Sequence, residues 1–284
     1  MIRIILSRGD GVGDRVWLQS IVRHVQTGLL QAGHAVAIDG KFGSDTEVVV
    51  RTFQEKANLG ITGIVDRPTW EALSPYLQST LGGREQLIAT LLPAFQGDPD
   101  WVHQQEGHRG NPYWPGGQSG VTLDPGVDLG NADRQLAEQL FASRLTPEQW
   151  KAVGTVIGLK GESARQALQQ DPILSSIRIT QDQANDIMPY AARPYWKGIS
   201  DRFASLTASA TPAAVQTVLL SLAYNRGFKN EALDVLHDPL SSGNWAGVAK
   251  AIGEMQQDHP LEGIRLRRRL EAALVEAELA YLNA

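Results

Sequence analysis

Apolar residues recur at helical spacing along most of this 284-residue chain, and one interval, residues 111–130, departs from that pattern. The interval is rich in glycine and proline and contains an alternating run at residues 120–124, which predicts a β-hairpin or a small three-stranded sheet. The chain is therefore predicted to be mainly α (α+β). Expected helices cover residues 14–30, 45–57, 85–95, 98–106, 181–189, 211–224, 244–256 and 261–282, with further starts at Asp66, Ala132 and Thr146.

The length of the chain suits two compact domains, because single hydrophobic cores rarely grow beyond about 250–300 residues. We place a first domain at residues 1–78, a linker at residues 79–84 around Gly82 and Gly83, and a second domain at residues 85–284. The first domain is expected to hold three helices. The second is expected to combine the small sheet with a helical bundle.

Composition excludes several classes of function. The formal net charge of -5 offers no basic face for phosphates, so we expect no nucleic-acid partner. The absence of cysteine excludes disulfides and thiolate metal sites. The six histidines form no His-x-x-His or His-Glu-x-x-His pattern, so we expect no metal and no cofactor. No stretch approaches the roughly 18 apolar residues that span a bilayer, and the first residues are too short for a signal peptide.

A weak repeat lies in the first domain. Residues 40–46 and 63–69 share the order glycine, apolar residue, glycine or aspartate, and threonine, and each run leads into a helix. Two interpretations stay open. The two helix starts either form a small groove or are simply two helix N-termini.

The same region resembles the three-helix peptidoglycan-binding domain of cell-wall hydrolases. The resemblance rests on Asp39-Gly40-Lys-Phe42-Gly43-x-x-Thr46, Phe53-Gln54, and Gly63-Ile-Val-x-x-x-Thr69-Trp70-x-x-Leu73. It implies attachment to the wall, through glycan or stem peptide. The residues that it implies in or near a groove are Asp39, Phe42, Thr46, Thr69 and Trp70. Phe42 and Trp70 suit the core equally well, and the core is favoured for Phe42.

Glu106 is a candidate proton donor. Asp98 and Pro99 open a helix that Gly107 ends, so Glu106 lies in the last turn. We expect partial burial there, beside the negative end of the helix dipole, which suits a general acid. The alternative is a solvated residue at the end of a helix.

The second domain resembles the muramidase domain of pesticin and related phage lysozymes, from about Asp98 to the end of the chain. The motifs are Gln105-Glu106-Gly107, Ser119-Gly-Val-Thr122-x5-Asp128-Leu-Gly130, Ser221-Leu-Ala-Tyr224-Asn225-Arg-Gly227, and Gly263-Ile-Arg-Leu-Arg267-Arg268. The order Glu, Thr, Asp is that of pesticin. The resemblance implies that Glu106 donates a proton while Asp128 and Thr122 activate water. Asp124 is a rival for the role of Asp128.

This resemblance implies a muramidase that cleaves the β-1,4 bond after N-acetylmuramic acid. Sugar contacts are expected from Tyr113, Trp114, Gln118, Tyr224 and Asn225. The basic run at residues 265–269 is interpreted as a solvated helix face, and the pair Tyr195-Trp196 as core.

A monomeric phage endolysin is the simplest biological context. It is made in the host cytoplasm, released through a holin pore, and acts on peptidoglycan in the periplasm. A lytic transglycosylase, a non-catalytic wall-binding virion protein and a bacteriocin toxin are the alternatives.

Overall fold

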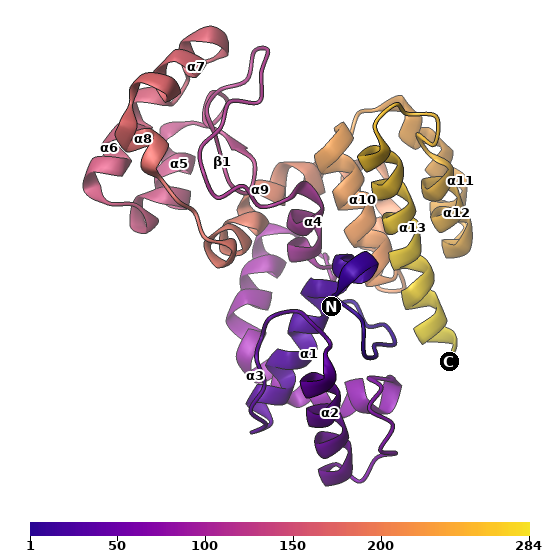
Figure 1. The fold of residues 1–284 in the computed structure, drawn as a ribbon. Helices are drawn as coiled ribbons and strands as arrows, with labels where there is room; N and C mark the ends of the chain where they lie inside the picture. The colour runs from indigo at the N-terminus through magenta and orange to yellow at the C-terminus, as the bar shows by residue number, and fades with distance from the viewer. The chain divides into compact units, whose positions relative to one another are not determined.

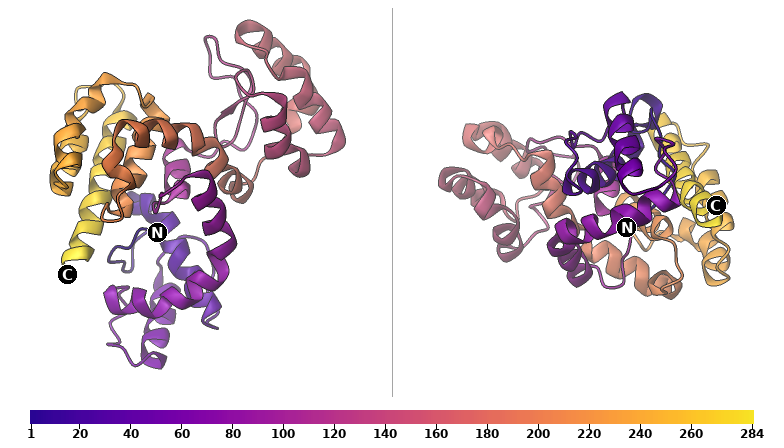
Figure 2. Two further views of the ribbon diagram at one scale, coloured as in Figure 1. Left: turned by 180° about the vertical axis from the view of Figure 1, so that it is seen from behind. Right: turned by 90° about the horizontal axis from the view of Figure 1, so that it is seen from below.

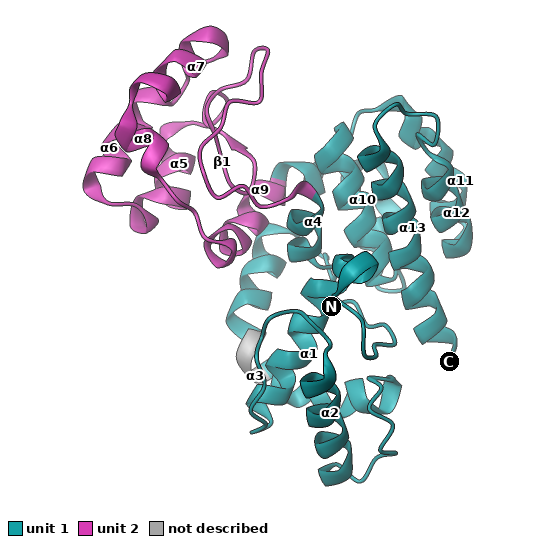
Figure 3. Ribbon diagram, in the orientation of Figure 1, with its two compact units in different colours: residues 1–105, 194–284 teal, residues 106–193 magenta. Residues whose placement is uncertain are grey.

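The computed structural model describes residues 1–78 and 82–284. It divides into two compact units, shown in Figure 3. Unit 1 comprises Met1–Gln105 and Pro194–Ala284, and unit 2 comprises Glu106–Arg193. The described residues are mostly helical and contain one two-stranded sheet, so the predicted mainly α fold class is confirmed.

The N-terminal part of unit 1 consists of one 3-10 helix and three α-helices. They are η1 (Gly13–Leu18), α1 (Gln19–Gln31), α2 (Ser44–Lys56) and α3 (Arg67–Leu91). Helix α1 packs against α2 and α3 (Figure 1), and its buried side chains include Ile21, Val25 and Leu29. The spacing of these residues matches the helix predicted from the sequence.

The start of α2 differs from the prediction at its cap. The sequence Ser44-x-x-Glu47 suggests a capping box, but Gly43 occupies the N-cap position and Ser44 is already helical. The Ser44 hydroxyl instead donates to the carboxylate of Asp45 at 3.3 Å. A residue inside the first turn cannot cap that turn, because capping needs the extended backbone that Gly43 adopts. By contrast, Asp66 caps α3 as predicted and accepts from the amide of Thr69.

The predicted linker falls within the bounds of α3. Residues 82–84 are helical, whereas residues 79–81 lie outside the described residues. Leu87 and Leu91 follow Gly82 and Gly83 at the helical spacing of four residues, and two glycines lower helix stability without ending a helix. The domain limits at residues 78 and 85 stay a prediction.

The rest of unit 1 is a helical bundle. Its elements are α4 (Pro99–Glu106, whose last residue begins unit 2), η3 (Ala204–Thr207), α10 (Ala213–Arg226), η4 (Glu231–Leu236), α11 (His237–Ser241), α12 (Trp245–Glu254) and α13 (Glu262–Asn283). Every residue from Ala213 to Ala223 of α10 is buried. Helix α13 packs against both α10 and α12, and the three helices lie side by side in Figures 1 and 2. A helix buried on all sides is the expected centre of such a bundle.

Unit 2 combines the sheet with short helices. Its elements are β1 (Thr122–Leu123), β2 (Val127–Asp128), α5 (Arg134–Phe141), η2 (Ala142–Arg144), α6 (Pro147–Val156), α7 (Gly161–Gln170), α8 (Pro172–Ser176) and the first part of α9 (Gln181–Arg202). The hairpin side chains Val121, Leu123 and Leu129 join the buried core of the helices. At the predicted helix start, Thr146 and Gln149 form a capping box.

Two helical features of unit 2 differ from the sequence prediction. Helices α7 and α8 were not expected, because α7 buries only Gly161 and Ala164 and so carries little apolar periodicity. Helix α9 does not stop at Pro189 but continues to Arg202. Proline removes one backbone donor, and the buried side chains of Met188 and Ala192 on either side keep the helical course favourable.

Candidate active site

Three candidate site residues lie in one row across the hairpin. In the antiparallel pair β1–β2, Thr122 is directly opposite Asp128. Tyr113 forms an isolated bridge to Thr122 from the other side, with amide-to-carbonyl distances of 3.0 and 2.7 Å. Directly opposed residues on neighbouring strands project from the same face of a sheet. Tyr113, Thr122 and Asp128 are therefore neighbours on one face, which the sequence motif alone did not establish.

The carboxylate of Asp128 is held by three donors. Its Oδ1 accepts from the backbone amides of Gly120 at 2.9 Å and Gly130 at 2.8 Å. Its Oδ2 accepts from the side-chain Nδ2 of Asn131 at 2.8 Å. The side chain is only half-buried, so solvent still reaches it. The carboxylate is thus fixed in orientation while remaining accessible.

The two glycines are required for this arrangement. A Cβ atom on Gly120 would lie 2.2 Å from the amide nitrogen of Gly130 and 2.5 Å from Oδ1 of Asp128. A Cβ atom on Gly130 would lie 2.7 Å from the carbonyl oxygen of Leu159. Distances this short are excluded by van der Waals repulsion. Only glycine at both positions allows the two amides to reach the same carboxylate oxygen.

Asp124, the rival for the same role, is enclosed. It is 3% exposed. Its Oδ2 accepts from the amides of Arg109 at 2.8 Å and Gly110 at 2.5 Å, and lies 2.9 Å from Nδ1 of His108. These contacts tie the segment after α4 to the hairpin. A buried carboxylate with its oxygen so occupied has little access to a water nucleophile, which favours Asp128.

Glu106 is the last residue of α4, and Gly107 follows with φ of +78°. Buried residues of α4 include Trp101, Val102 and His103. Glu106 itself is exposed, so the partial burial expected from the sequence is absent. The exposure of Glu106 follows from its position, because the three buried residues lie on the preceding turn.

Thr122 is buried, and its hydroxyl lies 3.5 Å from the carbonyl oxygen of Gly120.

The predicted sugar contacts of unit 2 differ in character. Tyr113 is half-buried, and the guanidinium of Arg109 lies 4.1 Å from its ring centroid. Burial raises the pKa of the Tyr113 hydroxyl. Trp114 is partly exposed, donates from Nε1 to the carbonyl of Ser119 at 3.0 Å and packs against the core. Gln118 is exposed.

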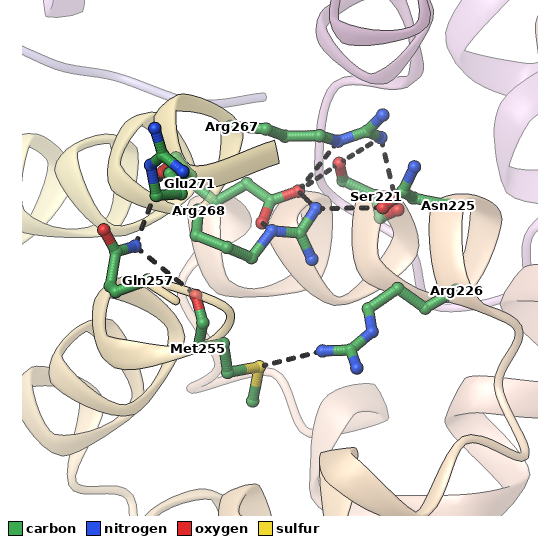
Figure 4. Close-up of polar contacts among 9 residues, drawn as sticks. Ser221, Asn225, Arg226, Met255, Gln257, Arg267, Arg268 and Glu271 are labelled. Atoms are coloured by element: carbon green, nitrogen blue, oxygen red, sulfur yellow. Dashed lines mark hydrogen bonds and ion pairs between the residues drawn. The ribbon is translucent and has the colours of Figure 1, made fainter. Parts of the chain in front are cut away.

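The other two predicted sugar contacts, Tyr224 and Asn225, lie near the end of α10 in unit 1. The ring of Tyr224 lies 4.5 Å from that of Tyr195, between centroids. Nη2 of Arg268 donates to Oδ1 of Asn225 at 3.3 Å. Figure 4 shows this contact at the edge of a larger polar cluster. The orientation of the Asn225 amide therefore depends on a side chain of α13.

The cluster contradicts the solvated interpretation for two members of the basic run, Arg267 and Arg268, whereas Arg269 is exposed as expected. Arg268 and Glu271 are 0% exposed and Arg267 is 7% exposed. Glu271 lies 3.0 Å from Nε of Arg268 and 3.3 Å from Nε of Arg267, and it accepts from the hydroxyl of Ser221 at 2.6 Å (Figure 4). Burial raises the pKa of Glu271 against the opposing effect of the two arginines. The prediction failed because the charges compensate one another inside the bundle. Trp196, expected in the core, is buried.

Each of the two similar turns in the N-terminal part is held by a buried glutamine. Oε1 of Gln26 accepts from the amide of Gly40 at 2.8 Å, and Oε1 of Gln54 accepts from that of Gly63 at 2.9 Å. Their Nε2 atoms donate to the hydroxyls of Thr46 at 3.3 Å and Thr69 at 3.0 Å. The repeat thus corresponds to two equivalent side-chain clamps, and both threonines serve to hold a turn.

The remaining wall-binding candidates divide by burial. Phe42 and Trp70 are both 0% exposed, and Nε1 of Trp70 donates to the carbonyl of Ile4 at 2.7 Å. Asp39 is exposed and accepts from Nε2 of Gln26 at 2.8 Å. Hydrogen bonds from Lys41 and Gln26 outweigh desolvation and lower the pKa of Asp39. Of the five candidates, Asp39 alone is exposed, and the core interpretation suits Phe42 and Trp70.

Residues 96–245 match a family described as the bacterial toxin homologue of phage lysozyme, C-terminal part. This match covers more than half of the 284 residues. The chain belongs to this family. Residues 19–73 match the peptidoglycan-binding domain family. The combination identifies a peptidoglycan-lytic enzyme with a peptidoglycan-binding domain at its N-terminus.

Other comparisons add little detail. No curated protein matches the chain. Among solved structures, the chain is similar to the crystal structure of a Burkholderia AP3 phage endolysin, with 21% identity and a TM-score of 0.21. That similarity covers 99% of this chain and 100% of the endolysin. Of the described helices of this lysozyme-family chain, none is long and apolar enough to cross a membrane.

Sequence analysis missed several residues that hold candidate functional residues of this lysozyme-family chain in place. Asn131 directly follows the Asp128-Leu-Gly130 motif, and a polar side chain so close to Asp128 in the sequence was the signal that could have identified it as a hydrogen-bond donor to that carboxylate. Gln26 and Gln54 precede their turns by 14 and 9 residues, so a search at one fixed offset cannot pair them. The stacking of Arg109 on Tyr113 has no signal in the sequence, because it depends on the bridge to Thr122.

Proposed function

We propose that this enzyme cleaves the β-1,4 bond between N-acetylmuramic acid and N-acetylglucosamine by an inverting mechanism. The observation that carries the proposal is the cross-strand row of Tyr113, Thr122 and Asp128, in which a fixed, accessible carboxylate adjoins a hydroxyl. A second carboxylate, Glu106, is exposed at the end of α4. Two carboxylates of separate roles are the usual apparatus of glycoside hydrolysis.

In the proposed reaction, Glu106 gives its proton to the glycosidic oxygen as the bond from that oxygen to the anomeric carbon breaks. Asp128 takes a proton from a water molecule whose oxygen forms the new bond to the anomeric carbon. Thr122 helps to hold that water. Attack from the face opposite the leaving group inverts the configuration. Protonated Asp128 and ionised Glu106 then exchange protons with solvent and restore the starting state.

We expect sugar contacts from Tyr113, Trp114, Gln118, Tyr224 and Asn225. The half-buried ring of Tyr113 suits a sugar face, since aromatic rings pack against apolar carbohydrate surfaces. The wall-binding domain is expected to raise the local concentration of enzyme on peptidoglycan. We further propose that the chain acts as a monomeric phage endolysin, without a nucleic-acid partner, on periplasmic peptidoglycan after release through a holin pore.

The test is mass spectrometry of purified peptidoglycan after digestion by the wild type and by Glu106→Gln. Fragments ending in reducing N-acetylmuramic acid, made by the wild type and reduced by about 100-fold or more in Glu106→Gln, support the proposal. Proton NMR of the freshly released ends distinguishes inversion from retention. Anhydro ends would instead identify a lytic transglycosylase, free stem peptides an amidase, and no products from either protein a wall-binding function alone.

A further inference from the structure

The turn before α7 is tied to the hairpin on both sides of Lys160. The amide of Gly158 donates to the carbonyl of Leu129 at 2.9 Å. The amide of Gly161 donates to the carbonyl of Ser119 at 2.9 Å. Leu129 and Ser119 each directly precede one of the two glycines whose amides hold Asp128. The backbone therefore fixes Lys160 relative to the segments that form the Asp128 site.

Two side-chain contacts connect Lys160 to Asp128. Nζ of Lys160 donates to Oδ1 of Asn131 at 2.6 Å, and Nδ2 of Asn131 donates to Oδ2 of Asp128 at 2.8 Å. An ammonium group can only donate, so the Asn131 atom that faces it is the carbonyl oxygen. The opposite orientation of the amide would face oxygen to carboxylate and N–H to ammonium, and would be repelled at both ends.

We propose that Asn131 and Lys160 are positioning residues for Asp128, with Lys160 acting only through the Asn131 amide. This inference rests on the proposed function, in which Asp128 is the base that activates water. Asn131 fixes the second oxygen of the carboxylate, and the Gly120 and Gly130 amides fix the first. Both side chains are exposed, so removing either one leaves the core of unit 2 intact.

The arrangement has a specific consequence for the chemistry. Without Nδ2 of Asn131, the Asp128 carboxylate loses one of the three donors that fix its orientation. A base that is less well oriented toward the attacking water lowers kcat and leaves substrate binding, and hence KM, nearly unchanged. Without Lys160, the contact to Asp128 alone orients the Asn131 amide, so the same loss occurs to a smaller extent.

The experiment measures kcat and KM of the full chain on soluble, uncrosslinked glycan strands. Asn131→Leu removes the amide at similar volume, Lys160→Met removes the charge, and Lys160→Arg restores it. We expect Asn131→Leu to lower kcat about tenfold with KM within twofold. Lys160→Met should lower kcat about threefold, and Lys160→Arg should recover the wild-type value. Lys151→Met, on exposed Lys151 of α6, is the matched control.

The double variant Asn131→Leu/Lys160→Met decides whether the two residues act as a chain. If Lys160 acts through Asn131, the double variant is no slower than Asn131→Leu alone. Losses of kcat that multiply in the double variant, or a change confined to KM, would each overturn the proposal, because they describe independent effects or a substrate contact. Thermal unfolding of every variant verifies folding. Failure of the proposed function has a different signature: Asp128→Asn would then keep wild-type kcat.

Discussion

The hairpin of unit 2 and the α10–α13 pair of unit 1 each hold a carboxylate among several polar partners, and the partners differ in kind. Asp128 is half-buried and is held by amide donors that carry no charge. Glu271 is 0% exposed and lies between Arg267 and Arg268, with Ser221 as a further donor. The first arrangement leaves the carboxylate free to exchange protons with water, whereas the second neutralises it within the bundle.

The difference teaches how to separate sites of chemistry from sites of stability in this molecule. A fully desolvated charge needs an opposite charge close by, and removing one partner leaves the other buried and uncompensated. An accessible charge held by neutral donors can change its protonation state without that penalty. We therefore expect substitutions at Asp128 to alter turnover and substitutions at Glu271 to alter folding, and four experiments test this separation.

The largest expected effect is on turnover in the hairpin. Asp128→Asn should lower kcat by about 100-fold or more, because a neutral amide cannot accept a proton from water. Thermal unfolding by circular dichroism should show only a small fall in Tm. Asn keeps the volume and its carbonyl oxygen still accepts from the Gly120 and Gly130 amides, while its NH2 group faces the donor of Asn131. A large fall in Tm with substantial residual turnover would remove the contrast between the two regions.

The second effect is on stability in the bundle. Glu271→Gln should lower the free energy of unfolding by about 3–5 kcal/mol, because Arg267 and Arg268 lose their buried counter-charge. Urea denaturation measures the loss. The same substitution at exposed Glu276 of α13 is the control and should change stability by less than about 0.5 kcal/mol.

A triple variant sharpens this second test. Arg267→Met/Arg268→Met/Glu271→Leu replaces all three buried charges by apolar side chains and should recover most of the stability lost in Glu271→Gln, because well-packed apolar replacements are often neutral. If the triple variant is less stable than Glu271→Gln, the destabilisation comes from packing and not from uncompensated charge.

The third effect concerns the glycines that support Asp128. Gly130→Ala should lower the free energy of unfolding by about 1–3 kcal/mol and also reduce kcat, since its Cβ would meet the Leu159 carbonyl oxygen at 2.7 Å. The control is Gly83→Ala in α3, whose Cβ meets no atom within 4 Å. That variant should be slightly more stable than the wild type, by up to about 1 kcal/mol. Equal changes in stability and kcat at the two glycines would contradict the requirement for glycine at position 130.

The smallest effect is a pH dependence in the bundle. Burial raises the pKa of Glu278 above its ordinary value of 4.5, although its Oε2 accepts from the amide of Ala214. A raised carboxyl pKa stabilises the fold while the group is protonated, below about pH 4.5, and this contribution is lost as pH rises through the folded-state pKa. Glu278→Gln should therefore gain stability relative to the wild type as pH rises.

Chemical denaturation of the wild type and Glu278→Gln from pH 4 to pH 8 measures this trend. Glu276→Gln again serves as the control and should give a curve parallel to the wild type. If Glu278→Gln instead loses stability relative to the wild type as pH rises, Glu278 is held ionised by its backbone donors.

Much of the fold could be predicted because its signals are local. The cap of Asp66 on α3 and the capping box of Thr146 and Gln149 depend on residues three positions apart, which the sequence displays directly. The helix α7 could not be predicted, since only Gly161 and Ala164 of its residues are buried. The prolines of α9 misled the prediction because packing on buried neighbours outweighed the local cost.

The sequence by itself determined the helical class and the position of the hairpin, because apolar periodicity and turn residues are properties of neighbouring residues. The candidates Glu106, Thr122 and Asp128 came from the resemblance to a family. Only the tertiary structure decided between Asp124 and Asp128 as the accessible carboxylate, since burial depends on segments distant along the chain. It also placed two arginines of the basic run, Arg267 and Arg268, against buried Glu271. Charge compensation is a relation between side chains in space, and a linear pattern of charges does not contain it.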